Sequence, residues 1–435
     1  MRSLAVWVLA AVGSWLSGVP SARAQALPIG PDFWVGGDLE LTHDPSAAID
    51  DERWFVVANV TDFFFCPSAC GFSDSGIWQG CQTLDDGGLT FWSQRPVDIA
   101  TIGVDDFLIV WEAYPWDPPS DPTSFIRGRR MSAHAVLLTD PFDVASSEVD
   151  HPRDPRVAAL PASRVILVWV DDSSSGTDDS GSSIQARIFT TDGIPLGPPF
   201  QINTTTLGDQ TMPDVATVPD GRFVVTWESA SSAGSDDSGT SIQLRRFNAE
   251  GEPIGSDEQV NTYISADQRN NRVACAGDGG FVIVWDSDGS SGNDQSSLSI
   301  QARIFGADGA PLGPEFQVNS YIDSAQNEPA VAAMADGRFE VVWTSDGSPG
   351  DDDSFRSVQR QAFDASGGTV GSQLQVNTTT YLSQWAPDIA TTPDGDFIVV
   401  WQSSENGLRG RIFRQTLLAD GFESGDTSAW STTVP

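Results

Sequence analysis

The chain of 435 residues contains no lysine, three histidines and only four tyrosines, four methionines and four cysteines. All its basic residues are arginine, and 60 acidic against 23 basic residues give a net charge of −37 at pH 7. Such a charge argues against nucleic acids and anionic membrane surfaces as partners, because both are polyanions. It fits a surface solvated by acids, or a protein that binds cations.

Long hydrophobic runs are also missing, because no stretch after residue 24 reaches the length that spans a bilayer. The first 24 residues combine Arg2, an apolar stretch over 4–16 and the small-residue pattern Ala22-Arg23-Ala24. This is the pattern of a secretory signal with its cleavage site. We therefore expect residues 1–24 to be removed, and a monomeric mature chain to be secreted or held at the cell surface.

Catalytic signatures are equally scarce. His43, His134 and His151 lie in no metalloprotease or serine-hydrolase motif, and no Cys/His spacing indicates zinc. We therefore assign no catalytic residue from the sequence.

The cysteines divide into a cluster and a remote residue. Cys66, Cys70 and Cys81 lie close in sequence, and an oxidising compartment favours one disulfide among these three, with the pair left open. Cys275 aligns with Thr or Ala in other repeats, so we expect a free thiol at a small core position.

What the chain does contain is a repeat. An apolar run ending in tryptophan recurs every 58 residues, at Trp111, Trp169, Trp227, Trp285, Trp343 and Trp401. The clearest unit, 213–261, reads as four short strands with tight turns at Pro219-Asp220-Gly221 and Ala249-Glu250-Gly251. A repeat of four short strands is typical of a propeller blade.

Seven such units can be counted. They lie near 47–93, 96–145, 155–203, 213–261, 271–319, 329–377 and 387–415. The last unit has no fourth strand of its own, whereas 28–36 resembles the fourth strand at 311–318. We therefore predict an all-β, seven-bladed β-propeller over 25–418, closed into a ring by the N-terminal strand 28–36 pairing with the last blade.

Closure places the long polar loops and the connections between blades on one rim, and the Asp-Gly turns on the other. Pairs of acids stand in the Gly/Ser loops nine and ten residues after the tryptophans, where they offer the oxygen ligands that Ca²⁺ prefers. The calcium candidates are Asp178, Asp179, Asp236, Asp237, Asp294, Asp352 and Asp353. The alternative is that these acids solvate the loops or pair with Arg187, Arg245 and Arg303.

Aromatic residues on the same rim are candidates for binding a ligand. They are Tyr263, Tyr321, Tyr381 and Trp385, all in or beside the connections between blades. Flat rings bind sugars and protein partners well. The alternative is that each ring packs on the neighbouring blade.

Three resemblances accompany the repeat. The pattern Asp-Gly-x-Phe-Val-Val-x-Trp-x-Ser, Ile-Gln-Ala-Arg-x-Phe and Gly-x-Pro-x-Gly-x-x-Phe-Gln-Val-Asn resembles tandem repeats of large exported bacterial surface proteins. The segment 85–91 is similar to the Asp-box of sialidase-like propellers, which supports the fold. The tail 419–435, with Asp420 to Trp430, is similar to a C-terminal sequence of exported bacterial proteins, which implies a sorting or attachment tag.

From these features we expect a non-enzymatic binding or surface protein whose glycan or protein ligand docks on the acidic loop-rich face, with Ca²⁺ as an optional ordering ion. The alternative is a glycan-acting hydrolase or lyase that uses rim carboxylates. A deep axial pocket with two carboxylates and a set of arginines would favour the enzyme, since the fold hosts both functions.

Overall fold

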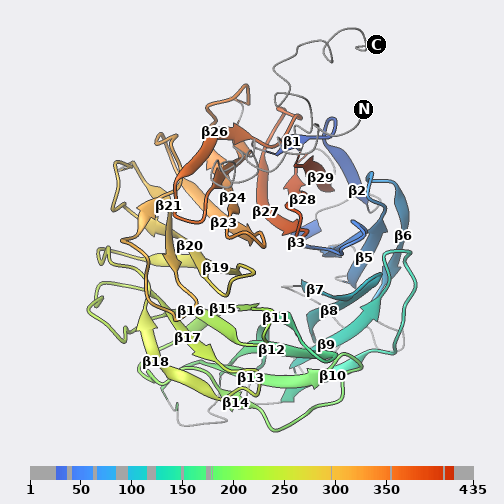
Figure 1. Ribbon diagram of the computed structural model, residues 1–435, viewed down its shortest axis with the longest axis vertical. Helices are drawn as coiled ribbons and strands as arrows, with labels where there is room; N and C mark the ends of the chain where they lie inside the picture. The colour runs from blue at the N-terminus through green and yellow to red at the C-terminus, as the bar shows by residue number, and fades with distance from the viewer. Residues whose placement is uncertain are drawn as a thin grey trace, which may run out of the picture.

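The structure, a computed structural model, describes residues 26–36, 42–61, 66–84, 97–114, 124–147, 151–172, 178, 180–294, 296–352, 355–404 and 407–415. All secondary structure in these residues is β. Seven antiparallel sheets stand radially around one axis, with the first strand of each sheet innermost (Figure 1). The predicted seven-bladed β-propeller is confirmed.

Each blade follows the chain from the axis outward. Blades one and two consist of β3 (Thr42–Ile49), β4 (Phe55–Thr61), β5 (Cys66–Phe72), β6 (Trp78–Thr83), β7 (Val97–Gly103), β8 (Asp106–Ala113), β9 (Ser124–Met131) and β10 (Phe142–Ser147). Blades three and four consist of β11 (Arg153–Leu160), β12 (Arg164–Asp171), β13 (Ser183–Thr190), β14 (Phe200–Gln201), β15 (Gln210–Thr217), β16 (Phe223–Ser229), β17 (Ser241–Phe247) and β18 (Pro253–Gln259).

Blades five and six consist of β19 (Gln268–Cys275), β20 (Phe281–Asp288), β21 (Leu298–Phe305), β22 (Phe316–Gln317), β23 (Gln326–Ala333), β24 (Phe339–Asp346), β25 (Arg356–Phe363) and β26 (Thr369–Gln375). Blade seven consists of β27 (Gln384–Thr391), β28 (Phe397–Ser403), β29 (Gly407–Arg414) and, from the other end of the chain, β1 (Leu27–Pro28) and β2 (Phe33–Gly36).

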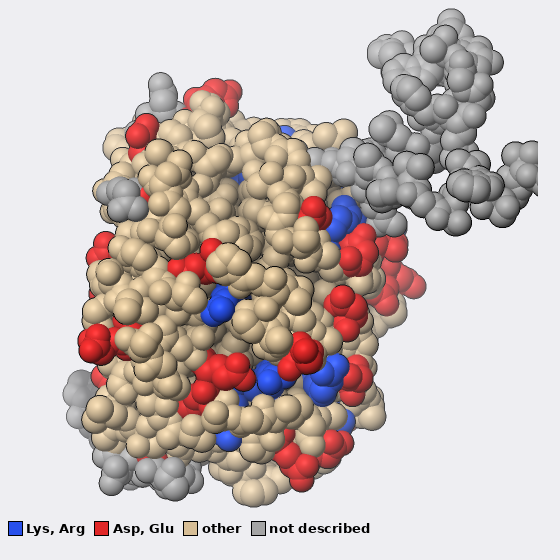
Figure 2. Space-filling view, turned by 60° about the vertical axis from the view of Figure 1, so that its left-hand side comes forward, with Lys and Arg blue, Asp and Glu red and all other residues tan. Residues whose placement is uncertain are grey.

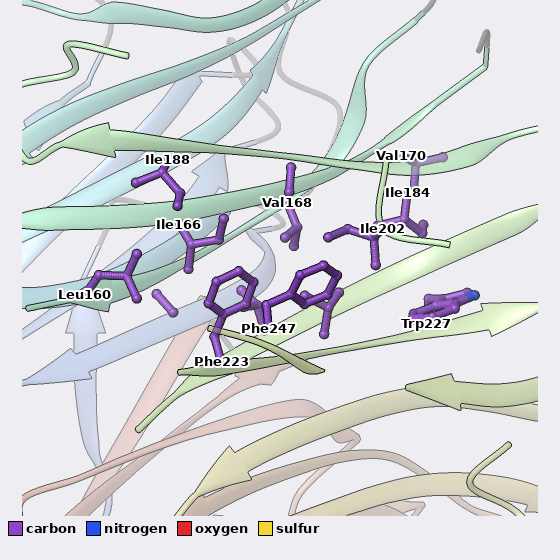
Figure 3. Packing of buried hydrophobic residues seen from close by; sticks show 14 residues of the cluster. Leu160, Ile166, Val168, Val170, Ile184, Ile188, Ile202, Phe223, Trp227 and Phe247 are labelled. Carbon is purple, nitrogen blue, oxygen red and sulfur yellow. The ribbon is translucent and has the colours of Figure 1, made fainter. Parts of the chain in front are cut away.

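Second strands lie in the middle of each blade and are apolar on both faces, because neighbouring blades cover both. Every residue of β16 is buried. Figure 3 shows the core between blades three and four, where Ile166 and Val168 face the rings of Phe223 and Phe247. The buried Trp227 indole N–H donates to Gln210 Oε1 at 2.9 Å. The same tryptophan–glutamine hydrogen bond recurs in blades five to seven. The repeat therefore preserves both the buried indole and the glutamine that accepts from it.

The ring is closed as predicted. Leu27 pairs with Arg414 and Phe33 with Gly410, so the N-terminal segment supplies the outer strand of blade seven. Arg411 then donates to Gly30 O at 3.2 Å and to Val376 O at 2.7 Å. Arg303 makes the same two contacts in blade five, which means that the closing blade reproduces an ordinary interface between blades.

The long loops and the connections between blades share one rim, called here the loop rim. In blade four the loop residue Thr240 donates its N–H to Asp267 of the next connection at 3.0 Å. In blade three Ser182 donates to Asp209 in the same way, at 3.1 Å. First strands therefore start at the loop rim and run toward the Asp-Gly turns.

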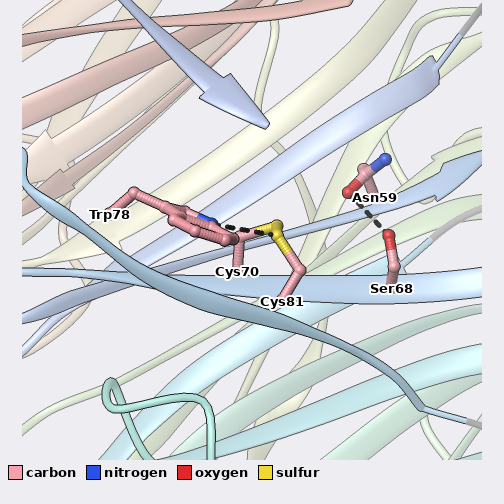
Figure 4. The surroundings of a disulfide bond; sticks show 5 residues. All are labelled: Asn59, Ser68, Cys70, Trp78 and Cys81. Atoms are coloured by element: carbon pink, nitrogen blue, oxygen red, sulfur yellow. Dashed lines mark hydrogen bonds between the residues drawn. A yellow bond between two sulfur atoms is a disulfide. The ribbon is translucent and has the colours of Figure 1, made fainter. Parts of the chain in front are cut away.

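A disulfide joins Cys70 on β5 to Cys81 on β6, and the Trp78 indole N–H donates to Cys81 Sγ at 3.3 Å (Figure 4). This confirms a single bridge within the predicted cluster. Cys275 is a free thiol, partly buried beside the core between blades four and five. The described part of the chain contains no helix of a length and hydrophobicity that would cross a bilayer. Three predicted segments lie outside the described residues: the signal 1–24, the Asp-box segment 85–91 and the tail 419–435.

Candidate functional site: an acidic axial cavity

A cavity of about 430 Å³ lies on the propeller axis, and all seven first strands contribute to its wall. The five acids in this wall come from five different blades, and the two arginines are Arg156 and Arg272. The acids are Asp98, Asp154, Asp214, Glu328 and Asp388. The cavity is therefore polar and carries an excess of negative charge.

Seven of the lining residues occupy one register position and form what we call the axial ring. In blade order they are Ser46, Asp98, Arg156, Asp214, Arg272, Ala330 and Asp388. Acid and base alternate from blade two to blade five, whereas Asp388 stands between two uncharged neighbours. Radial symmetry of the strands thus brings together side chains whose successive positions in the chain are 52 residues apart from blade one to blade two and 58 residues apart thereafter.

Each aspartate of the axial ring also bonds to the next blade. Asp98 Oδ2 accepts the Val157 N–H at 2.7 Å, and Asp214 Oδ2 accepts the Val273 N–H at 2.7 Å. Asp388 Oδ2 accepts the Ala47 N–H at 2.8 Å across the closing interface. These three carboxyls therefore hold the lining strands in place as well as facing the cavity.

Burial is the main electrostatic influence on the ring. It raises the pKa of Asp98 from 3.8 to about 6, against the opposing effect of the Arg156 charge. It raises the pKa of Asp214 and of Asp388 in the same direction. Burial lowers the pKa of Arg156, but the carboxylates of Asp98 and Asp214 outweigh it and the net shift is upward. Asp98 is thus a carboxyl that carries a proton part of the time near neutral pH.

Toward the loop rim, the cavity is lined by residues two positions before the axial ring in five of the first strands, and we call this end the mouth. We call Asp154, Met212, Asn270, Glu328 and Ala386 the mouth ring. All five have a left-handed backbone, with φ between 47° and 55°, at a register shift in the first strand. None is glycine, so each carries a conformational cost of about 1 kcal/mol. Bulges of this kind re-aim side chains next to a site.

Further acids lie directly behind the mouth ring, at the position after three of the repeated tryptophans, Trp111, Trp227 and Trp285. Glu228 Oε1 accepts the Asn270 N–H at 2.6 Å, and Asp286 Oδ2 accepts from Asn270 Nδ2 at 2.8 Å. Burial raises the pKa of Asp286 to about 7 and raises that of Glu228. Within the described residues, Asp286 Oδ1 is buried without a hydrogen-bond partner.

The corresponding acid in blade two has a different partner. Glu112 accepts a hydrogen bond from the Tyr114 hydroxyl, and burial raises the pKa of Glu112 to about 8. The mouth thus carries carboxyls that hold protons at neutral pH on the side of blades two and three as well as on the side of blade five.

The calcium candidates are placed differently from the axial cavity. Asp178, Asp236, Asp294 and Asp352 are buried in the loops, and each accepts a hydrogen bond of 2.7–2.8 Å from the side-chain amide of the asparagine two residues after the fourth strand. Asp237 is exposed. Asp179 and Asp353 lie outside the described residues. No group of three or more His, Cys, Asp or Glu in the described residues is arranged to hold a metal. Calcium binding stays a prediction.

The arginines considered as partners of these acids bind backbone carbonyls. Arg187 Nε donates to Gly197 O at 2.7 Å, and Arg245 Nη1 donates to Ile202 O at 2.6 Å in the preceding blade. The loop acids and the third-strand arginines therefore serve separate contacts.

The aromatic candidates fall into two groups. Tyr263 and Tyr321 are partly buried, and their hydroxyls lie where a Cβ would stand on Gly289 and Gly347. Packing on the following blade therefore accounts for these two rings. Tyr381 is 63% exposed, and Trp385 lies partly exposed on β27, directly before Ala386 of the mouth ring.

The axial ring was not identified from the sequence. Its signal is a variable, often charged residue directly before the apolar second half of the first strand, as in Pro155-Arg156-Val157, Pro213-Asp214-Val215 and Pro387-Asp388-Ile389. Only closure of the ring shows that these positions meet at the axis.

Comparisons with known proteins find similarity at the level of the fold. No protein-family model matches the chain, and no curated protein matches it. Among solved structures the chain is similar to an ulvan lyase of polysaccharide lyase family PL25, with a TM-score of 0.54 and 12% identity over 90% of this chain and 96% of that one. It is also similar to a protein of unknown function from Dyadobacter fermentans, with a TM-score of 0.51 and 10% identity over 74% of this chain and 94% of that one.

A puromycin hydrolase matches with a TM-score of 0.51 and 13% identity, over 86% of this chain and 51% of that one. At these identities the similarity shows a shared β-propeller fold. Glycan-acting enzymes are among the proteins that share it.

Proposed function

We propose that this protein is a glycan-acting enzyme whose active site is the axial cavity. The observation that carries the proposal is the axial ring, in which Asp98, Arg156, Asp214 and Arg272 alternate along one side of a 430 Å³ cavity. A pocket on the axis that carries carboxylates and arginines supports an enzyme over a purely binding propeller.

The chemistry needs a proton donor and a proton acceptor on either side of one bond. Asp98, whose pKa is raised to about 6, is the donor to the leaving-group oxygen. Asp214, on the far side of Arg156, is the base that takes a proton from water in a hydrolase or from the sugar in a lyase. In either case one proton enters the leaving group and one is taken up by Asp214, so the pair must exchange a proton with solvent after each cycle.

Arg156 is the charged group between the two carboxyls. Within the described residues its guanidinium donates one hydrogen bond, from Nη1 to Pro155 O at 3.0 Å, and Nε lies 3.9 Å from Asp214 Oδ1. Further N–H groups therefore remain for oxygen atoms of a bound sugar. Their charge stabilises oxyanion character that develops during bond cleavage.

The similarity to an ulvan lyase supports this proposal at the level of fold, because that propeller acts on a polysaccharide. Export of the chain, expected from residues 1–24, belongs to the same proposal, since polysaccharides occur outside the cell. The tail 419–435 would then attach or sort the enzyme at the surface.

Non-enzymatic binding is the second candidate function. It is favoured by the hydrogen bonds of Asp98, Asp214 and Asp388 to neighbouring blades, because those bonds give the three carboxyls a structural role without catalysis.

The experiment compares the three aspartates, because all three accept a hydrogen bond from the next blade but only Asp98 and Asp214 are proposed to be catalytic. Asp388 is therefore the control. Asp98→Asn, Asp214→Asn and Asp388→Asn each keep a side-chain oxygen that can accept the bond to the next blade. The purified variants are incubated with a panel of polysaccharides, and reducing ends and unsaturated products are measured. We expect the first two substitutions to lower turnover about 10²- to 10⁴-fold, and Asp388→Asn to stay within a few-fold of the wild type. An equal loss in all three, parallel to a loss of stability, would support the binding role instead.

A further inference from the structure

Blades six and seven depart from the repeat at the loop rim by exposing aromatic rings. Phe355 is 64% exposed and Tyr381 63% exposed, and Trp385 lies partly exposed beside the mouth ring. By contrast Trp285, Trp343 and Trp401 are fully buried. Large exposed rings on an otherwise Ser-, Gly- and Asp-rich surface indicate a binding site.

We propose that Phe355, Tyr381 and Trp385, named here the aromatic strip, bind an uncharged polysaccharide chain and lead it to the axial cavity. This inference rests on the proposed function, because the axial cavity is taken as the place where the polysaccharide is cleaved. It adds the surface that binds the polysaccharide and the class of polysaccharide.

The repeat places Phe355 against the connection that carries Tyr381. Its position corresponds to Gly181 in blade three and Gly239 in blade four, each 27 residues before its counterpart in the following connection. A Cβ on Gly181 would lie 3.0 Å from the backbone of Gly208, and a Cβ on Gly239 would lie 3.3 Å from the backbone of Ala266. The position that corresponds to Gly208 and Ala266 in the connection after blade six is Leu382, so the repeat places Phe355 beside the connection that carries Tyr381.

Tyr381 is not placed like the other two tyrosines of the connections. Asn261 Nδ2 donates to Tyr263 O and Asn319 Nδ2 to Tyr321 O, whereas Asn377 Nδ2 donates to Thr379 O. Tyr381 therefore stands two residues further along its connection and lacks the glycine on which the others pack. Its ring remains available to a ligand.

Trp385 connects the strip to the cavity. It directly precedes Ala386, whose N–H donates to Glu328 Oε2 at 3.0 Å in the mouth ring. Glu328 also accepts from Thr344 Oγ1 at 2.8 Å. A chain stacked on the strip thus reaches the mouth between blades six and seven, where polar groups are in place for its hydroxyls.

Charge selects an uncharged occupant. Five acids and two arginines line the cavity, and the chain as a whole carries −37. Figure 2 shows acidic side chains spread widely over one side of the molecule, with fewer basic ones among them. A polysaccharide rich in uronate or sulfate would be repelled at every step. Of the two reactions proposed above, this inference therefore keeps the hydrolase, because a lyase needs the acidic C–H beside a uronate carboxyl. An uncharged chain meets no such penalty, and the C–H faces of its rings stack well on aromatic side chains.

The test measures binding in the Asp98→Asn background, so that cleavage does not interfere. Retardation is measured in native gels that contain either an uncharged or a uronate-rich polysaccharide. Phe355→Ala, Tyr381→Ala and Trp385→Ala are compared with Leu207→Ala, which removes a 70% exposed apolar side chain at the place of Tyr381 in the connection between blades three and four.

We expect retardation by the uncharged polysaccharide only, and an approximately 5- to 10-fold weaker affinity for each aromatic variant, with Leu207→Ala unchanged. Equal weakening by Leu207→Ala, no weakening by the aromatic variants, or stronger binding of the uronate-rich chain would overturn the inference. Failure of the proposed function is distinguishable, because the wild type would then cleave nothing while the strip still bound.

Discussion

The buried carboxyl of Asp286 predicts an unusual dependence of stability on pH. Asp286 is 2% exposed, one of its oxygens has no partner within the described residues, and Glu228 and Glu328 add negative charge nearby. Burial is the largest cause of the rise of its pKa from 3.8 to about 7. Because the folded-state pKa is raised, the folded protein holds a proton that the unfolded chain releases. The contribution of Asp286 to stability is therefore fully present below about pH 4 and is lost as the pH rises from about 4 to about 7.

The magnitude follows from the size of the shift. A rise of roughly three pKa units corresponds to about 4 kcal/mol at pH 8, at about 1.4 kcal/mol for each unit, and water entering the mouth would reduce this value. Asp286→Asn removes the ionisation, keeps an oxygen for Asn270 Nδ2 and places an amide N–H toward the neighbouring carboxylates. We expect the variant to be more stable than the wild type by up to about 4 kcal/mol at pH 8, and nearly equal to it at pH 4.

The assay is urea unfolding at both pH values, with Asp237→Asn as the exposed control. The difference between each variant and the wild type is compared at the two pH values, since other carboxyls titrate in both proteins. A gain that is the same at pH 4 and pH 8, or a loss at pH 8, would refute the assignment of a buried, proton-holding carboxyl at this position.

Four further outcomes are expected. Deleting residues 28–36 should lower the melting temperature and increase the hydrodynamic radius, because β29 loses its partner; unchanged values would contradict ring closure. Cys81→Ser should cost about 3 kcal/mol in thermal or urea unfolding, whereas Cys275→Ser should cost less than half of that. Asp236→Ala should cost about 1–3 kcal/mol, because one Asn261 N–H is left buried and unpaired. If calcium binds the loops, millimolar Ca²⁺ should raise the melting temperature of the EDTA-treated wild type, and no shift would remove the metal.

Much of the fold could be predicted from the sequence because the repeat is written into local patterns. The apolar runs before Trp227 and its counterparts require a strand covered on both faces, and Asp-Gly turns fix where the chain reverses. Ring closure followed from a missing strand at one end and an extra one at the other. The sequence could not specify the closing contacts, such as Arg411 with Val376 O, because these join residues whose proximity depends on the whole ring.

Less of the candidate site could be predicted. The Gly/Ser-rich context of the loop acids predicts ion ligands, and this stays a prediction. The hydrogen bond from Asn261 to Asp236 could not be predicted, because it depends on the placement of both segments in the folded blade. Conversely, Asp98 and Asp388 stood alone in apolar strands. The chemistry of Asp98 and Asp388 depends on side chains from other blades, and a local sequence pattern does not show which side chains those are.

The most direct test of the account is the structure of the Asp98→Asn protein with an oligosaccharide derived from the polysaccharide that the wild type cleaves. We predict that the sugar chain lies on the loop rim, stacks on Trp385 and enters the axial cavity, with a glycosidic oxygen within hydrogen-bond distance of the residue at position 98. Sugar bound only to the outer strands of the blades, with the axial cavity free of ligand, would contradict the central claim.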